Sequence, residues 1–312
     1  MKGKDLLSIA DFSAGDIRLL INNALEMKTE GWNSLLSGKT LALLFEKPSL
    51  RTRVSFELAM VQLGGHTIYL SPAEVGLGKR ESVADVARVL SRYVDALAAR
   101  TFSHQTLELL AADSAVPVIN ALSDREHPCQ ALADLLTIYE KKERLEGLTI
   151  AYLGDGNNVA HSLLLAAAIT GVNMRIASPA GYQVEESIRQ LAKASADESG
   201  AELFLTEDPR LAVTGADVIY TDVWASMGQE TEAESRRRIF AGYQLNQQLL
   251  PLARDNAIIM HPLPAHRGEE IVDEVLDSPA SVVFDQAENR MHLQKALLAG
   301  MLGGLEIPLA KY

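Results

Sequence analysis

Short apolar runs alternate with longer amphipathic stretches over almost the entire chain, and this alternation restricts the fold more than any other feature. The apolar runs predict strands at 41–46, 67–70, 95–100, 116–122, 148–155, 174–178, 202–206, 217–223, 257–263 and 281–286. The amphipathic stretches predict helices at 54–63, 81–93, 104–112, 129–143, 157–170, 184–199, 234–250 and 291–303. Strands that alternate with helices pair in parallel and carry helices on both faces of the sheet, so the predicted fold class is α/β.

The chain has 312 residues, which is too long for one ordinary small core. We therefore expect either two doubly wound domains or one large α/β domain. The segment EGLTIAYLGDG follows the predicted helix at 129–143 and is typical of the start of a new βαβ unit. A domain boundary is therefore predicted near 136–147.

Charge and composition exclude several classes of protein. With a net charge of −12, the chain lacks the basic character of nucleic-acid-binding proteins, so no nucleic-acid partner is predicted. No apolar run is long enough to span a membrane, and the N-terminus lacks the apolar core of a signal peptide, so we expect a soluble cytoplasmic protein. The single cysteine, Cys129, excludes internal disulfides. No metal and no other cofactor is predicted, because no cluster of ligand residues at metal-binding spacing appears.

The segment FEKPSLRTRVSFE gathers three cations, Lys47, Arg51 and Arg53, at one point of an acidic chain. It reads as a strand-to-helix turn in which Ser49 caps the helix and leaves the N–H groups of residues 50–52 free. Free amides and the helix dipole attract anions, and an arginine fork fits phosphate oxygens. The alternative is a capped helix whose arginines are only solvated, and this segment by itself leaves both interpretations open.

Further polar side chains follow other predicted strands. Arg100 is the last residue of the strand at 95–100, and His127 and Gln130 follow the strand at 116–122. Ligands of open α/β sheets bind at the carboxyl ends of strands, where these residues are expected. Together they supply donors that could surround a carbonyl oxygen and an amide nitrogen.

Seven motifs in order along the chain carry a family resemblance. They are FEKPSLRTRVSFE, ARVLSRYVDAL, HPCQALADLLT, GDGNNVAHSLL, DVWASMGQE, HPLPAHRGEE and FDQAENRMH. With these motifs the chain resembles the transcarbamylases nearly end to end, and in particular their ornithine-specific branch. The resemblance implies transfer of the carbamoyl group of carbamoyl phosphate to the δ-amine of L-ornithine, which gives L-citrulline and phosphate. It also implies a homotrimer, or a multiple of trimers, and no cofactor.

The resemblance assigns residues to each substrate. Carbamoyl phosphate binding is implied for Ser49, Leu50, Arg51, Thr52, Arg100, His127 and Gln130, with Arg53 ending the S-x-R-T-R motif. Ornithine binding is implied for Asn158, Asp222, Ser226, Met227, Pro262 and Leu263, and contact with both substrates for Arg290. Catalytic roles are implied for Thr52, Arg100, His127 and Asp222, whereas His261 and His266 are interpreted as structural or lid residues.

The resemblance also implies a division of the chain. Residues 1–136, joined by a C-terminal helix at about 287–312 that returns to the first domain, are expected to bind carbamoyl phosphate. Residues 137–286 are expected to bind ornithine. Arg290 is expected just before the last predicted helix, 291–303.

The sequence departs from the family pattern at two positions. Pro262 replaces the usual cysteine, so a thiol near Asp222 is absent, although the carbonyl groups of Pro262 and Leu263 remain available. Gly76 replaces a glutamine that in the family reaches a neighbouring subunit, a contact for which Lys79 or Arg80 would have to compensate.

Three alternatives remain at this point. The acceptor could be aspartate, putrescine or an N-acylated ornithine, which the Pro262 departure keeps open. The chain could be a non-catalytic relative that binds carbamoyl phosphate or a partner. The loop GDGNN could belong to a nicotinamide enzyme, but the acidic residue that binds the ribose is missing from the next strand end, IASPAGY.

Overall fold

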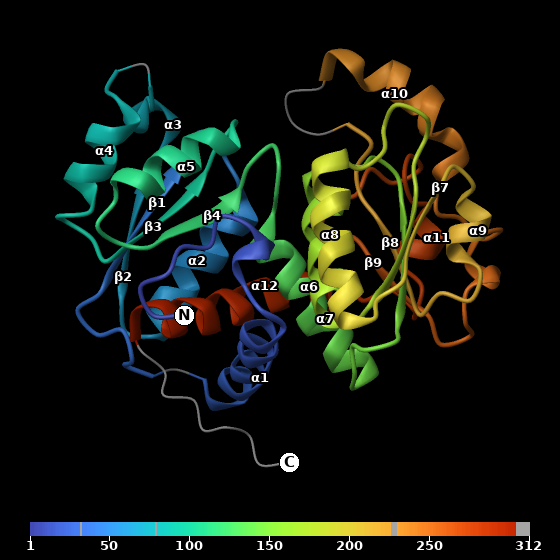
Figure 1. Ribbon diagram of the computed structural model, residues 1–312, viewed down its shortest axis with the longest axis horizontal. Coiled ribbons are helices and arrows are strands. Elements are labelled where there is room, and N and C mark those ends of the chain that lie inside the picture. The colour runs from blue at the N-terminus through green and yellow to red at the C-terminus, as the bar shows by residue number, and fades with distance from the viewer. Residues whose placement is uncertain (32, 79, 226–229, 304–312) are drawn as a thin grey trace. The chain divides into compact units, whose positions relative to one another are not determined.

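The computed structural model describes residues 1–31, 33–78, 80–225 and 230–303. The chain forms two compact units (Figure 1). Unit 1 comprises Met1–Leu136 and Asn289–Tyr312, and unit 2 comprises Thr137–Glu288. Helices α6 (Pro128–Lys142) and α12 (Val283–Leu298) contain the points at which the chain passes from one unit to the other.

Unit 1 contains a four-stranded parallel sheet in the order β2-β1-β3-β4. Its strands are β1 (Thr40–Phe45), β2 (His66–Leu70), β3 (Ala96–Arg100) and β4 (Val118–Leu122). Its helices are η1 (Ile9–Asp11), α1 (Ala14–Glu30), α2 (Leu50–Gln62), α3 (Pro72–Val75), α4 (Val83–Leu90) and α5 (His104–Asp113), with η5 (Ala299–Gly303) after α12. The central strands β1 and β3 are buried almost throughout, as expected for parallel strands covered on both faces.

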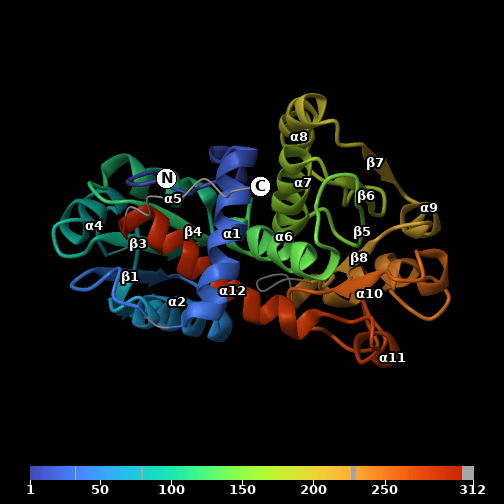
Figure 2. The ribbon, with the colours of Figure 1, turned by 90° about the horizontal axis from the view of Figure 1, so that it is seen from below.

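The part of α12 that belongs to unit 1 lies beside α1 (Figures 1 and 2). Lys295 of α12 is buried, and its Nζ donates hydrogen bonds to the carbonyl groups of Met27 (2.6 Å) and Gly31 (3.1 Å) at the end of α1. The same ammonium donates to Gln62 Oε1 (3.2 Å) at the end of α2. One lysine thus connects three helices that are far apart in the sequence.

Unit 2 contains a five-stranded parallel sheet in the order β7-β6-β5-β8-β9. Its strands are β5 (Thr149–Leu153), β6 (Asn173–Ala177), β7 (Leu203–Thr206), β8 (Val218–Thr221) and β9 (Ile258–Met260). Its helices are α7 (Asn158–Thr170), α8 (Glu186–Ser199), α9 (Pro209–Val213), η2 (Glu230–Glu232), α10 (Ala233–Phe240), η3 (Ala241–Tyr243), η4 (Leu250–Leu252) and α11 (Asp273–Leu276). Helix α7 is apolar on nearly all sides, and its residues 159–168 are all buried.

Each sheet has one point at which the strand order reverses, between β1 and β3 in unit 1 and between β5 and β8 in unit 2. The loops that leave the carboxyl ends of the two strands at such a point diverge and expose a crevice, where open α/β sheets bind their ligands. The relevant loops are those after Phe45 and Arg100 in unit 1, and those after Leu153 and Thr221 in unit 2.

The two parallel sheets flanked by helices, with a C-terminal helix, confirm the predicted fold class. The predicted strand at 281–286 is wrong, because α12 begins at Val283 and only Ser281 forms a single bridge, to Ile259. A short apolar run does not distinguish a strand from a buried helix segment. The earlier start places Arg290 inside α12, not before the last helix.

The predicted helix at 234–250 is too long. Helix α10 ends at Phe240 and is followed by the short helical turns η3 and η4. Gly242 lowers helix propensity at that point, and Pro251 cannot continue a helix from the preceding turn. None of the described helices combines the length and the apolar character needed to cross a membrane.

Candidate active site

In unit 1, the turn after β1 forms a capped helix start, as predicted. Ser49 Oγ accepts a hydrogen bond from the Thr52 N–H (3.3 Å), and Arg290 Nη2 donates to Thr52 Oγ1 (2.8 Å). The prediction of three free amides is wrong in one respect, because the Thr52 N–H is occupied by the cap. The N–H groups of Leu50 and Arg51 belong to the first turn, which has no acceptor within its own helix.

The side chains of the S-x-R-T-R motif point in different directions. Leu50 is 77% exposed, so only its main chain can contribute to a buried site. Arg53 is turned away, because its Nε pairs with Glu57 Oε1 at 2.9 Å and its guanidinium lies 4.0 Å from the ring centroid of Tyr69. Arg51 is partly buried, and this burial lowers its pKa. The motif therefore supplies one inward cation, Arg51, and not two.

Arg100, His127 and Arg290 are buried near Arg51. Burial, followed by the charges of Arg290 and Arg51, lowers the pKa of Arg100 to about 10. Burial, together with the charges of Arg290 and Arg100, holds the pKa of His127 well below its usual value, so the imidazole is neutral at neutral pH. The structure thus brings together cations from β3, α2 and α12 with a neutral imidazole from the loop after β4.

Two buried polar atoms of this cluster have no hydrogen-bond partner among the described residues. Arg100 Nε is buried without a hydrogen-bond acceptor, and Gln130 Oε1 is buried without a donor. Gln130 is oriented by its Nε2, which donates to Asp134 Oδ1 (2.8 Å). Buried charge is costly unless it is paired. A donor-rich cluster of this kind suits an anion that also carries an amide group.

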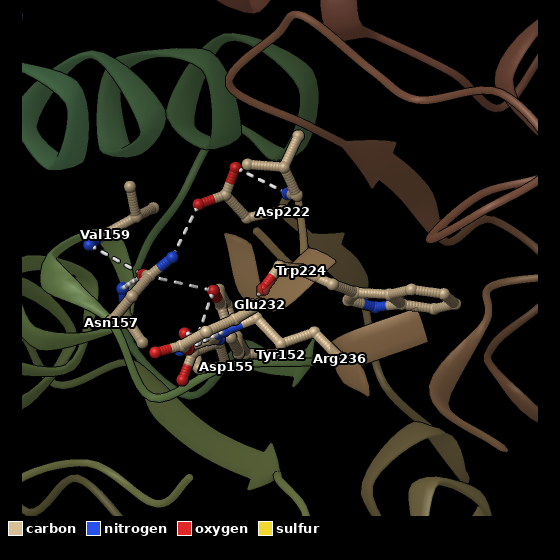
Figure 3. A network of polar contacts seen from close by, with 10 residues as sticks. Tyr152, Asp155, Asn157, Val159, Asp222, Trp224, Glu232 and Arg236 are labelled. Atoms are coloured by element: carbon tan, nitrogen blue, oxygen red, sulfur yellow. Dashed lines mark hydrogen bonds and ion pairs between the residues drawn. The ribbon is translucent and has the colours of Figure 1, made fainter. Parts of the chain in front are cut away.

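In unit 2, the loop after β5 presents Asn157, a residue that the sequence reasoning did not select. Its Oδ1 caps α7 by accepting from the N–H groups of Val159 (2.9 Å) and Ala160 (3.1 Å). Its Nδ2 donates to Asp222 Oδ2 (2.8 Å), as Figure 3 shows. The preference of helix N-caps for asparagine could have identified Asn157. The predicted residue, Asn158, is the first residue of α7 and is partly buried.

Asp222 follows β8 directly, at the strand end where it was predicted. It is buried, and its Oδ1 accepts from the Val223 N–H (2.8 Å). Burial raises the pKa of Asp222, while His261 and the hydrogen bonds from Asn157 and Val223 lower it and Glu270 raises it further. A buried carboxylate next to few donors favours the approach of a cation.

His261 and Glu270 form a fully buried pair near Asp222, and both contribute to the pKa of that carboxylate. His261 Nδ1 accepts from the Leu263 N–H (2.9 Å), so the ring proton lies on Nε2, which donates to Glu270 Oε1 (3.0 Å). The His266 N–H donates to the same oxygen (2.6 Å). These bonds fix the path of the loop that carries Pro262, so His261 has a structural role.

The other predicted residues of unit 2 have simpler outcomes. Pro262 is buried, and Leu263 is partly buried in a left-handed conformation (φ 56°). Ser226 and Met227 lie outside the described residues.

In unit 1, Gly76 ends α3 in a left-handed conformation. Lys79 lies outside the described residues, so the replacement of the family's glutamine contact by Lys79 or Arg80 stays a hypothesis.

Among the described residues, His266, Glu269 and Glu270 place one potential ligand atom each within 4.8 Å of one another. Two of them already have partners, because Glu269 Oε1 pairs with Arg237 Nε (2.8 Å) and Glu270 binds His261. His266 is exposed. We assign no metal to this group.

Comparison with known families gives two matches that together cover nearly the whole chain. Residues 4–140 match the aspartate/ornithine carbamoyltransferase carbamoyl-P binding domain. Residues 146–301 match the aspartate/ornithine carbamoyltransferase Asp/Orn binding domain.

Individual relatives are similar over their full length. The chain is 54% identical to the ornithine carbamoyltransferase of Anoxybacillus flavithermus, over 97% of this chain and 98% of the relative. It is 53% identical to the anabolic ornithine carbamoyltransferase of Pyrococcus furiosus, over 98% of each chain. A solved structure of ornithine carbamoyltransferase from that organism superimposes with a TM-score of 0.94 and covers 98% of this chain and 99% of its own.

Proposed function

The chain belongs to the aspartate/ornithine carbamoyltransferase family, and we propose that it transfers the carbamoyl group of carbamoyl phosphate to the δ-amine of L-ornithine, giving L-citrulline and phosphate. Unit 1 binds carbamoyl phosphate, and unit 2 binds ornithine. The observation that carries this proposal is the cluster of buried guanidinium groups beside the start of α2, with Arg100 Nε buried and without an acceptor among the described residues.

The donor half of the proposal rests on charge and on hydrogen-bond type. The phosphate lies at the N-terminus of α2, where the amides of Leu50 and Arg51 and the Arg51 guanidinium supply donors. The carbonyl oxygen of the carbamoyl group accepts from Thr52, Arg100 and His127. The unpaired Gln130 Oε1 accepts from the carbamoyl NH₂. Arg290, which donates to Thr52 Oγ1, keeps that hydroxyl in place.

The acceptor half rests on Asp222. Its buried carboxylate attracts the cationic side chain of ornithine, and the Asn157 amide holds the carboxylate in one orientation. Asn158 and Leu263 complete the ornithine site in this proposal, together with the carbonyl of Pro262. Ser226 and Met227 are further proposed contacts in the part of the chain outside the described residues.

The chemistry needs no nucleophile from the protein, since the ornithine δ-amine attacks the carbamoyl carbon. A lysine-like amine has an ordinary pKa of about 10.4, so it must lose a proton before attack. Asp222 orients the amine while that proton passes to a base or to the substrate phosphate. Negative charge then develops on the carbonyl oxygen, where the loss of one donor typically lowers the rate by about 10²–10³. Arg51 and the helix amides stabilise the departing phosphate.

The family membership and the named relatives bear on two of the alternative functions. Membership of this family removes the nicotinamide enzyme, and the relatives reported above are named for ornithine, which does not favour the other acceptors. A homotrimer, or a multiple of trimers, and a cytoplasmic location remain parts of the proposal.

The proposal is tested by incubating the protein with carbamoyl phosphate and each of four amines, namely ornithine, aspartate, putrescine and N-acetylornithine, and following the product by mass. We expect citrulline from ornithine and little product from the others. The variant Arg51→Met should lose most activity and bind carbamoyl phosphate weakly. The matched control is Arg53→Met, from the same motif, whose guanidinium is turned toward Glu57 and should be dispensable. No product with any amine, or equal effects of the two variants, contradicts the proposal.

A further inference from the structure

Arg236 of α10 is a nearly buried arginine that none of the assigned roles uses. Its side chain is 8% exposed, and its Nη1 donates to Asp155 Oδ2 (2.7 Å) and to the Trp224 carbonyl (2.9 Å). Its Nε pairs with Glu232 Oε2 (3.2 Å), and its guanidinium lies over the ring of Tyr182 at 5.0 Å. Figure 3 shows this guanidinium between the loop after β5 and the chain after β8.

The partners of Arg236 lead to the acceptor carboxylate in a few steps. Asp155 lies two residues before Asn157, whose N–H donates to the Asp155 carbonyl (2.8 Å). The Tyr152 hydroxyl donates to the same carbonyl (3.0 Å) and lies 3.4 Å from Asn157 Oδ1. Asn157 in turn holds Asp222 (Figure 3). A displacement of Asp155 therefore moves the amide that orients Asp222.

The turn between Asp155 and Asn157 has little freedom to adjust. A Cβ at Gly156 would overlap the backbone of Gln183 and Val184, and the Gly156 N–H donates to the Tyr182 carbonyl (2.8 Å). The backbone of this turn thus rests against the segment whose Tyr182 ring also packs on Arg236. The side chain of Asp155 is held by Arg236, while its own carbonyl is held by Tyr152.

The chain after β8 is held by the same guanidinium. Trp224, whose carbonyl accepts from Arg236, lies two residues after Asp222. Arg236 therefore connects both strand-end loops that flank the reversal of strand order in unit 2. The two loops diverge at this position of the sheet, and a rigid planar fork suits a bridge between a carboxylate on one loop and a carbonyl on the other.

We propose that Arg236 is a positioning residue for the amine acceptor, which fixes the turn at residues 154–157 and the chain at Trp224 so that Asn157 holds Asp222 ready for the substrate amine. This inference rests on the proposed function of unit 2. It predicts that loss of Arg236 impairs the binding of ornithine but not that of carbamoyl phosphate. A general loss of stability would impair both.

The test compares Arg236→Gln with the wild-type protein in steady-state kinetics with both substrates varied. We expect the KM for ornithine to rise about 10- to 100-fold, since small misplacements of a positioning group have effects of this size. The KM for carbamoyl phosphate should stay close to the wild-type value, because the contacts of Arg236 described above all lie in unit 2. Arg236→Lys keeps the charge but lacks the fork, so its KM for ornithine should be intermediate.

Two further variants sharpen the result. Asp155→Asn keeps the size of the side chain and removes its charge, so it should raise the KM for ornithine in the same way, even where Arg236→Gln folds poorly. The double variant should add little to the larger single effect, because both changes break one contact. The matched control is Arg238→Gln on the same helix, since Arg238 is 77% exposed and pairs only with Glu234 among the described residues.

The outcomes separate this inference from the proposed function. Absence of carbamoyl transfer to any amine by the wild-type protein overturns both. Transfer to an amine other than ornithine overturns the choice of ornithine alone, and the variants are then measured with that amine. An active wild-type protein whose Asp155→Asn variant keeps its KM for the acceptor, or whose variants raise both KM values equally, overturns the positioning role.

Discussion

Replacement of Arg100 by methionine should stabilise the protein and at the same time lower the rate of carbamoyl transfer by about 10²–10³. Arg100 is only 9% exposed and lies near two other cations, Arg290 and Arg51. Its Nε has no acceptor among the described residues. The free protein therefore carries a buried charge, which in the proposed function meets an anion, and that charge opposes folding while the anion is absent.

The magnitude follows from the pKa. Burial and two neighbouring cations lower the pKa of Arg100 to about 10. Each pKa unit corresponds to about 1.4 kcal/mol, so the charged form costs the folded state on the order of 3 kcal/mol. The folded protein binds this proton less tightly than the unfolded chain, so the cost is fully present below about pH 10 and disappears only as pH rises toward the ordinary pKa of arginine. Methionine retains most of the apolar stem and loses about 1 kcal/mol of packing. A net gain of about 2 kcal/mol corresponds to roughly 4–8 °C in Tm.

The assay is thermal unfolding at neutral pH, followed by calorimetry, with and without inorganic phosphate. Phosphate should raise the Tm of the wild-type protein, since a ligand that binds the folded state stabilises it. It should raise the Tm of Arg100→Met by less, because that variant keeps Arg51 but lacks one of the neighbouring cations. The control Arg88→Met removes an exposed arginine that pairs with Asp113 (2.6 Å), and we expect a change below about 1 kcal/mol. An Arg100→Met protein that melts below the wild type, or whose Tm rises with phosphate as much as that of the wild type, would falsify this reasoning.

Three further predictions concern unit 2. Gly156→Ala should lower the free energy of unfolding by about 1–3 kcal/mol or more, because its Cβ would overlap the backbone at Val184, whereas Gly242→Ala, where a Cβ meets nothing within 4 Å, should be nearly neutral in chemical denaturation. Burial raises the pKa of Asp222, so the kcat/KM for ornithine should fall on the acid side at a pH above 3.8, and Asp222→Asn should remove that limb; an unchanged pH profile in the variant would contradict its role. Pro262→Cys should change the KM for ornithine or the pH profile, and kinetics identical to the wild type would make this departure from the family pattern inconsequential.

The sequence located the unit 1 cluster because its signals are local. Ser49 caps α2 as predicted, and Arg100 ends β3 as predicted. Parallel pairing then makes these strand ends neighbours, since β1 and β3 are adjacent and Phe45 is in register with Arg100. Spacing and strand periodicity were therefore sufficient to bring Arg51 and Arg100 together, although the binding of carbamoyl phosphate there remains a proposal.

The errors of the sequence reasoning have a common cause. Sequence spacing does not distinguish Arg51 from Arg53, yet the Glu57 carboxylate and the ring of Tyr69 turn Arg53 outward. Arg290 was placed before a helix because the apolar residues that open α12 have the composition of a strand. In both cases the outcome depends on packing partners that no local pattern contains.

The sequence by itself determined the alternation of strands and helices, the caps of the helices and the strand ends at which cations and carboxylates gather. These properties follow from residue periodicity and from hydrogen bonds over a few positions. Only the tertiary structure decided that Asn157 holds Asp222, that Arg236 joins the loops at Asp155 and Trp224, and that Arg100 has a depressed pKa. Such properties depend on burial and on distances between residues remote in the chain, which exist only once the sheet has formed.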